Sequence, residues 1–304
     1  MVLNSIFPVF SLIVLGYLLK KFNLINDIFL RTSDKLIYFI FFPALLFWKI
    51  GGFSSIAIYW LFCGTVLSAI IAIYFLSCIT LKVFKVTDYQ AGSFSQSCYR
   101  FNTYIGMAVI INALGDEGVK HFGILIGFAI PLINFLAVST LIWFSGRDFN
   151  LGQRIRITVK ALLSNPLILA CIAGILYARF TGYFPVFIDN ALRLSTFVTL
   201  PLALLSIGGS LTLKNFKEHF RLSLVASALK LVLLPVTGYL FMKEFNVPLM
   251  PFKVGMIFFT LPTSTAIYVL SSQLNSDTQL ASASIVISTV LSFFSLSIIL
   301  LMFS

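Results

Sequence analysis

The sequence predicts an all-α integral membrane protein with ten transmembrane helices. Of its 304 residues, 59% are hydrophobic and only 10% are charged, whereas a soluble domain carries about 25% charged residues. The charges fall in short clusters, and the apolar blocks between them are roughly 17–25 residues long, enough to cross about 30 Å of hydrocarbon. Because lipid cannot hydrogen-bond the backbone, these blocks are expected to be helices.

The ten predicted spans follow one another with only short polar connections, which leaves no room for a separate soluble domain. The start, "MVLNSIFPVF", lacks a basic region and is not expected to be a cleaved signal peptide. The predicted spans are residues 3–20, 35–50, 56–82, 91–113, 120–144, 160–180, 188–212, 220–243, 251–273 and 279–303.

The net charge of +11 is explained by membrane topology rather than by nucleic-acid binding. Of the 21 lysines and arginines, thirteen lie in loops on one side of the predicted membrane and six on the other. Basic loops face the cytoplasm and contact anionic lipid. This bias predicts a multi-pass protein of the cell membrane with both termini outside the cytoplasm. The four cysteines lie in apolar spans and are expected to be buried, without a metal or a disulfide.

The two halves of the chain match each other at an offset of about 160 residues. "FFPALLFWKIGG" (41–52) matches "TLPLALLSIGGS" (199–210), and "FNTYIGMAVIINALG" (101–115) matches "LPTSTAIYVLSSQLN" (261–275). We therefore expect a first five-helix repeat over 1–145, a cytoplasmic linker over 146–159, and a second repeat over 160–304. Because five is odd, the second repeat enters the membrane from the opposite side. Inverted repeats of this kind are typical of secondary transporters that work by alternating access.

The fourth and ninth spans are predicted to be broken near the midplane. Pro262 removes a backbone donor and faces Asn102 across the repeat, a residue type that favours helix ends. Two broken helices that cross bring positive helix N-termini together, which favours an anion. The residues predicted to bind a substrate carboxylate there are Asn102, Thr103, Pro262, Thr263 and Ser264. The alternative is that Pro262 only kinks its helix.

Arg100 and Lys230 are the two basic residues inside predicted spans, whereas all ten acidic residues lie in loops or at span ends. Ionisable groups at such depth are costly and point to function. Both cations are therefore predicted to face a negatively charged substrate. The alternatives are that Arg100 clamps helix-end carbonyls and that the Lys230 ammonium reaches a water-filled cavity. No cofactor or metal site is predicted, and no catalytic motif indicates an enzyme.

Several stretches resemble the auxin efflux carrier family, most closely its prokaryotic members known as malate or malonate permeases. They are "FFPALLF", "NPLILACIAGI", "PLALLSIGGSL", "RFNTYIGMAVI", "LPTSTAIYVLSSQL" and "ASASIVISTVLS". The resemblance implies a fold similar to bile-acid sodium symporters. Helices 1, 2, 6 and 7 would form a scaffold that pairs two copies as a homodimer. Helices 3–5 and 8–10 would form a transport domain that moves as an elevator. The crossover asparagine and proline of the family map onto Asn102 and Pro262, and Phe101 stands where plant members carry a proline.

The predicted function is secondary transport of small organic anions, such as malate, malonate or auxin-like acids. A first alternative is a sodium-coupled symporter whose ion is held by backbone carbonyls and hydroxyls. A second is a membrane sensor that binds such ligands without moving them. No nucleic-acid partner is expected.

Overall fold

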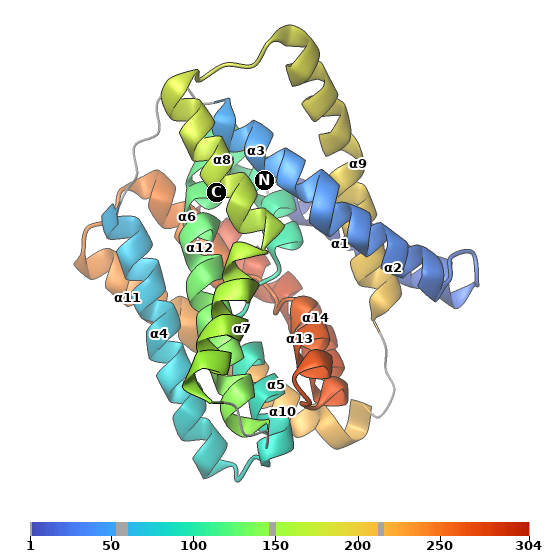
Figure 1. Cartoon of the computed structure of the whole chain (residues 1–304), viewed down its shortest axis with the longest axis vertical. Coiled ribbons are helices and arrows are strands. Elements are labelled where there is room, and N and C mark those ends of the chain that lie inside the picture. Colours follow the sequence, from blue (N-terminus) through green and yellow to red (C-terminus); the bar gives the residue numbers. More distant parts are fainter. Residues whose placement is uncertain (1, 53–59, 146–149, 212–215, 304) are drawn as a thin grey trace.

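The chain is helical throughout the part that the computed structural model describes, which is residues 2–52, 60–145, 150–211 and 216–303 (Figure 1). No strand occurs within these ranges. By length and composition, six of the described helical stretches are long and apolar enough to cross a membrane. This architecture agrees with the helical integral membrane protein that the composition predicts.

Fourteen α-helices and two short π-helices make up the described chain. They are α1 (Val2–Lys21), α2 (Asp27–Leu36), η1 (Ile37–Phe41), α3 (Phe42–Gly51), α4 (Trp60–Val83), α5 (Asp88–Tyr99), α6 (Thr103–Phe144), α7 (Leu151–Leu163), α8 (Pro166–Phe180), α9 (Val186–Ser210), α10 (Phe216–Ala228), η2 (Leu229–Leu233), α11 (Leu234–Glu244), α12 (Leu249–Thr260), α13 (Ala266–Gln273) and α14 (Thr278–Met302).

The predicted spans are helical over most of their described length, but two regions differ in extent. Helix α2 begins at Asp27, well before the predicted start at residue 35. Helix α7 occupies Leu151–Leu163, where the sequence predicted mainly a linker; residues 146–149 of that linker lie outside the described residues. Within α6, Gly115 has φ 64° and ψ −156°. This left-handed residue divides the helix where the sequence predicts the border between two spans.

Each π-helix is explained by a proline that follows it. Pro43 is the second residue of α3 and Pro235 the second residue of α11. Proline has no N–H and therefore cannot continue the ordinary hydrogen-bond ladder. The residue before each proline instead bonds five positions back, Phe42 to the Ile37 carbonyl and Leu234 to the Leu229 carbonyl. The widened turn η2 carries Lys230.

The helices pack in two groups that lie on opposite sides of the molecule (Figure 1). In one group, α1 packs along α9, and α3 packs on α8 and α9. The backbones of α1 and α9 touch: a Cβ on Gly16 would collide with the Leu205 carbonyl oxygen, and one on Gly208 would collide with that of Ile13. In the other group, α4 packs on α5 and α11, and α10 packs on α14. Helix α6 contacts both groups.

Candidate binding site at two helix breaks

Two helices are interrupted in the interior of the protein, and the interruptions have the same backbone form. Helix α5 ends at Tyr99, and Arg100 follows with φ −67° and ψ 149°. Helix α12 ends at Thr260, and Leu261 follows with φ −66° and ψ 145°. The chain resumes as a helix at Thr103 in the first case and at Ala266 in the second. We refer to residues 100–102 and 261–265 as the paired breaks.

A backbone hydrogen bond joins the paired breaks, from the Asn102 N–H to the Pro262 carbonyl over 2.9 Å. The chains approach closely beside it, because a Cβ on Gly106 would lie 2.6 Å from Leu261 Cδ1. The Phe101 and Phe258 rings pack with their centroids 4.3 Å apart. The two residues that the sequence singles out as helix breakers, Asn102 and Pro262, are therefore direct neighbours.

Asn102 begins α6 through its side chain. Its Oδ1 accepts hydrogen bonds from the backbone N–H groups of Tyr104 and Ile105, both at 3.1 Å. These are donors of a first helical turn, which otherwise lack intrahelical partners. Asn102 is buried, whereas Thr103 is half-buried. The first break thus forms without a proline because an asparagine cap supplies the helix start.

The second break places polar groups of Thr263 and Ser264 in the protein interior. The Thr263 N–H donates to Ser288 Oγ of α14 over 3.1 Å, and Ser264 Oγ accepts from the Ala266 N–H over 3.3 Å. Thr263 Oγ1 is fully buried and has no hydrogen-bond partner among the described residues. A buried hydroxyl without a partner is costly and calls for an explanation. A bound polar ligand would supply that partner.

Both buried cations lie at the carbonyl end of an interrupted helix. The Arg100 guanidinium donates to Gln96 Oε1 over 3.2 Å and to Asn134 Oδ1 over 3.1 Å. Lys230 Nζ donates to the Phe259 carbonyl over 3.2 Å. In the described chain, neither cation pairs with a carboxylate, and no hydrogen bond links either of them to Asn102, Thr263 or Ser264. Lys230 thus clamps a helix-end carbonyl, whereas the Arg100 guanidinium binds two side-chain oxygens.

Sequence reasoning missed two side chains that support this region, namely Asn134 and Ser288. Asn134 lies 34 positions from Arg100, and Ser288 lies 25 positions from Thr263. Such contacts depend on how distant helices are rotated against each other. Ser288 falls within the stretch "ASASIVISTVLS" that carried the family resemblance, but the stretch alone gives it no role.

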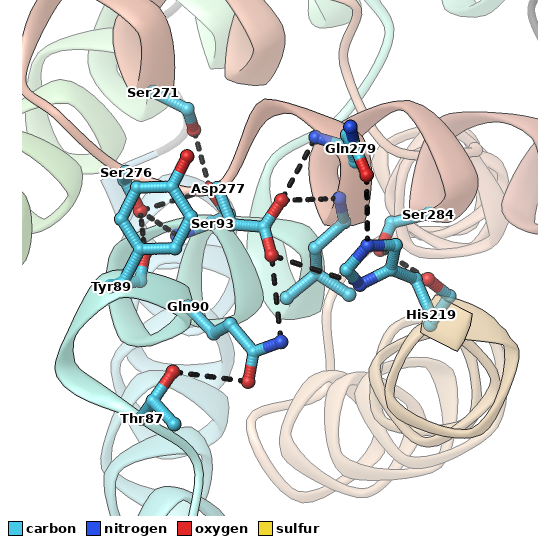
Figure 2. Close-up of polar contacts among 12 residues, drawn as sticks. Thr87, Tyr89, Gln90, Ser93, His219, Ser271, Ser276, Asp277, Gln279 and Ser284 are labelled. Atoms are coloured by element: carbon cyan, nitrogen blue, oxygen red, sulfur yellow. Dashed lines mark hydrogen bonds and ion pairs between the residues drawn. The ribbon is translucent and has the colours of Figure 1, made fainter. Parts of the chain in front are cut away.

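A second polar cluster, far from the breaks along α5, connects three helix ends (Figure 2). Asp277 caps α14 by accepting from the Gln279 and Leu280 N–H groups at 2.9 and 3.0 Å. Its other oxygen lies 3.4 Å from Gln90 Nε2 and 3.7 Å from His219 Nδ1. The start of α5, the start of α10 and the turn before α14 are thereby tied together.

The same turn is also bonded to α5 through serines and the backbone (Figure 2). The Asp277 N–H and Ser276 Oγ both donate to the Tyr89 carbonyl, at 2.9 and 2.8 Å. Ser93 Oγ donates to Ser271 Oγ over 2.7 Å. This cluster holds the ends of the broken helices in place, away from the breaks themselves. The described residues contain no group of three or more His, Cys, Asp or Glu side chains that could hold a metal.

Comparison with known proteins gives two matches. A family model described as "Membrane transport protein" matches residues 153–300. The chain is also 23% identical, over 298 residues and 95% of both chains, to an uncharacterized transporter of Methanocaldococcus jannaschii. Both matches agree with the motifs quoted above and with the helical, apolar fold. The second half of the chain is thus similar to the membrane transport protein family, and the chain as a whole is similar to a transporter.

Proposed function

We propose that this transporter is a secondary carrier of small organic anions, with the substrate carboxylate bound at the paired breaks. The observation that carries the proposal is the hydrogen bond between the Asn102 N–H and the Pro262 carbonyl. It brings together the regions where α6 and α13 begin, and helix N-termini favour negative charge. The Thr263 hydroxyl, which has no partner among the described residues, adds a donor there. Asn102, Thr103, Pro262, Thr263 and Ser264 are the proposed binding residues.

The proposed mechanism is alternating access between two inverted five-helix repeats, 1–145 and 160–304. The matching backbone of Arg100 and Leu261, 161 positions apart, supports this symmetry. Asn102 and Thr263 are buried, so a substrate reaches them only when the helix groups separate. The α1, α2, α3, α8 and α9 group would be the scaffold and the homodimer interface. The group of α4, α5, α10 to α12 and α14, together with α6, would be the moving transport domain.

The proposal also assigns the chain to the cell membrane, with both termini outside the cytoplasm. That orientation places the α5 start, the α10 start and the Asp277 turn at the cytoplasmic side. It can be checked by cysteine labelling with an impermeant reagent at residues in each loop.

The first experiment is a thermal-unfolding screen of the purified protein against malate, malonate, indole-3-acetate and neutral analogues. A ligand that binds the native state raises the unfolding midpoint. The account expects at least one carboxylate to raise the midpoint and the matching amide to leave it unchanged.

The second experiment is counterflow of that carboxylate in proteoliposomes. Accumulation of labelled substrate against unlabelled internal substrate supports a carrier. Specific binding without counterflow would favour a sensor. Flux that requires sodium would favour a sodium-coupled symporter.

A further inference from the structure

Each interrupted helix has a buried cation of the protein itself at its carbonyl end. Lys230 Nζ lies 3.2 Å from the carbonyl oxygen of Phe259, which is next to the last residue of α12. Arg100 is the residue that follows the last turn of α5, and its guanidinium folds back onto Gln96 of that turn. A helix C-terminus carries a partial negative charge, roughly half an elementary charge, and attracts cations.

In secondary transporters with broken helices, these carbonyl ends are where a coupling sodium ion or proton is held. Lys230 already fills that position at α12. Its side chain is fully buried, and the described residues place no carboxylate in an ion pair with it. The Phe258 ring also lies near the ammonium, with its centroid 5.8 Å from Nζ. The ammonium is therefore held mainly by the end of α12.

The two cations reach their positions by different routes. Arg100 is itself part of the first break, directly after α5. Lys230 comes instead from the π-helix η2, in a neighbouring helical stretch. Pro235 produces that widened turn and thereby sets the direction of the lysine. Lys230 contacts a main-chain carbonyl of the helix end directly, whereas the Arg100 guanidinium lies at its helix end on the side-chain oxygens of Gln96 and Asn134. Both ends thus have a positive charge of the protein beside them.

We propose that Lys230 and Arg100 are built-in substitutes for a coupling cation, so that this carrier binds its anion without sodium. The inference rests on the proposed anion carrier function. With Lys230 at the carbonyl end of α12 and Arg100 at that of α5, the positive N-terminal ends of the α6 and α13 dipoles leave a net attraction for an anion at the paired breaks. Lys230 is here a positioning residue that acts through the end of α12, without contacting the substrate.

The test that needs no substrate is thermal unfolding of the purified wild-type protein in NaCl, KCl and choline chloride at equal ionic strength. The inference expects the same midpoint in all three salts. A midpoint raised selectively by sodium would show a sodium site and overturn the inference. The salt test contains no organic anion, so its outcome does not depend on whether the protein transports one. A failure of the proposed anion transport would appear only in the flux assay.

The second test is flux of the transported anion by wild type, Lys230→Arg, Lys230→Met and Lys243→Met. Lys243 is the matched control, because it lies exposed at the end of α11. We expect the wild-type flux to be independent of sodium. Lys230→Met should lower the flux at least tenfold, whereas Lys230→Arg should keep it within threefold of wild type. Lys243→Met should leave the flux unchanged. The inference would be overturned if Lys230→Met transported the anion as fast as wild type, or if Lys230→Met and Lys230→Arg both lost transport. If Lys230→Met does not fold, the sodium dependence of wild-type flux and of Lys230→Arg still decides the question.

Discussion

The backbone N–H of Asn102 and the carbonyl of Pro262, 160 positions apart in the chain, form a hydrogen bond of 2.9 Å. The bond joins two points at which a helix stops in the interior, inside the fourth and the ninth predicted spans. Asn102 also caps α6 with its side chain. One residue therefore fixes both the start of a half-helix and the junction with its partner.

Substitution of Asn102 separates capping from binding. Asn102→Ala removes the acceptor for the Tyr104 and Ile105 N–H groups and is expected to lower the free energy of unfolding by about 1–2 kcal/mol. Asn102→Asp keeps a capping oxygen and should retain most of the stability. The measurement is denaturant or thermal unfolding in detergent. Asn112→Ala, at an exposed position of the same helix, is the control and should change little. Equal losses in Asn102→Ala and Asn102→Asp would contradict the capping role.

Thr263→Val tests whether the buried hydroxyl serves the ligand. Since Thr263 Oγ1 has no partner among the described residues, its removal should leave stability unchanged or raise it by about 1 kcal/mol. The same change should weaken anion binding about tenfold, measured as the ligand concentration needed for half the thermal shift. A destabilised Thr263→Val with normal ligand binding would show that the hydroxyl is structural.

Gly106→Ala tests the close approach at the paired breaks. The added methyl group would meet Leu261 Cδ1 at 2.6 Å and the Phe122 ring at 2.7 Å, so a loss of about 1–3 kcal/mol in unfolding free energy is expected. Gly64→Ala is the matched control, because a Cβ there meets nothing within 4 Å. Ala is a better helix former than Gly, so that variant should be slightly more stable. Recovery in the double variant Gly106→Ala, Leu261→Ala would locate the clash.

Asp277→Ala should loosen the cluster that ties α5, α10 and α14 together (Figure 2). It removes the cap of α14 and the acceptor for Gln90, at an expected cost of about 1–2 kcal/mol. Asp277→Asn preserves the capping oxygen and should lose less than half of that. Thermal unfolding of the two variants measures this difference in stability. In addition, hydrogen exchange at the first turn of α14 should be faster in Asp277→Ala but not in Asp277→Asn. Identical behaviour of the two variants would rule out capping as the main role.

The ion pair between Lys49 Nζ and Asp116 Oδ1, 2.6 Å apart, connects α3 of the proposed scaffold to the Gly115 turn of the proposed transport domain. Asp116 is 73% exposed, so its loss should cost less than about 1 kcal/mol of stability. If the two groups move against each other, the pair must open in each cycle. Asp116→Asn should therefore change the rate of counterflow by more than twofold, and the charge swap Lys49→Asp with Asp116→Lys should restore it. An unchanged rate in Asp116→Asn would separate this pair from the motion.

The sequence predicted the helical membrane class and the positions of both breaks for clear physical reasons. Apolar length and scarce charge define membrane helices, and the match between "FNTYIGMAV" and "LPTSTAIYV" pointed to Asn102 and Pro262. The contacts of Arg100, Lys230 and Thr263 could not be predicted. In a membrane helix, the lipid-facing and core-facing sides are both apolar, so no periodic pattern reveals which side meets Asn134, Phe259 or Ser288. Only the packed structure fixes those rotations.

The central claim is tested most directly by counterflow of labelled malate, malonate and indole-3-acetate through wild type, Asn102→Asp and Asn112→Asp in proteoliposomes. The account predicts that wild type and Asn112→Asp move at least one of these anions at similar rates. It predicts that Asn102→Asp, folded but with a carboxylate at the paired breaks, loses at least 90% of that flux, about 1.4 kcal/mol or more in binding or barrier energy. Undiminished anion flux in a folded Asn102→Asp protein would contradict it.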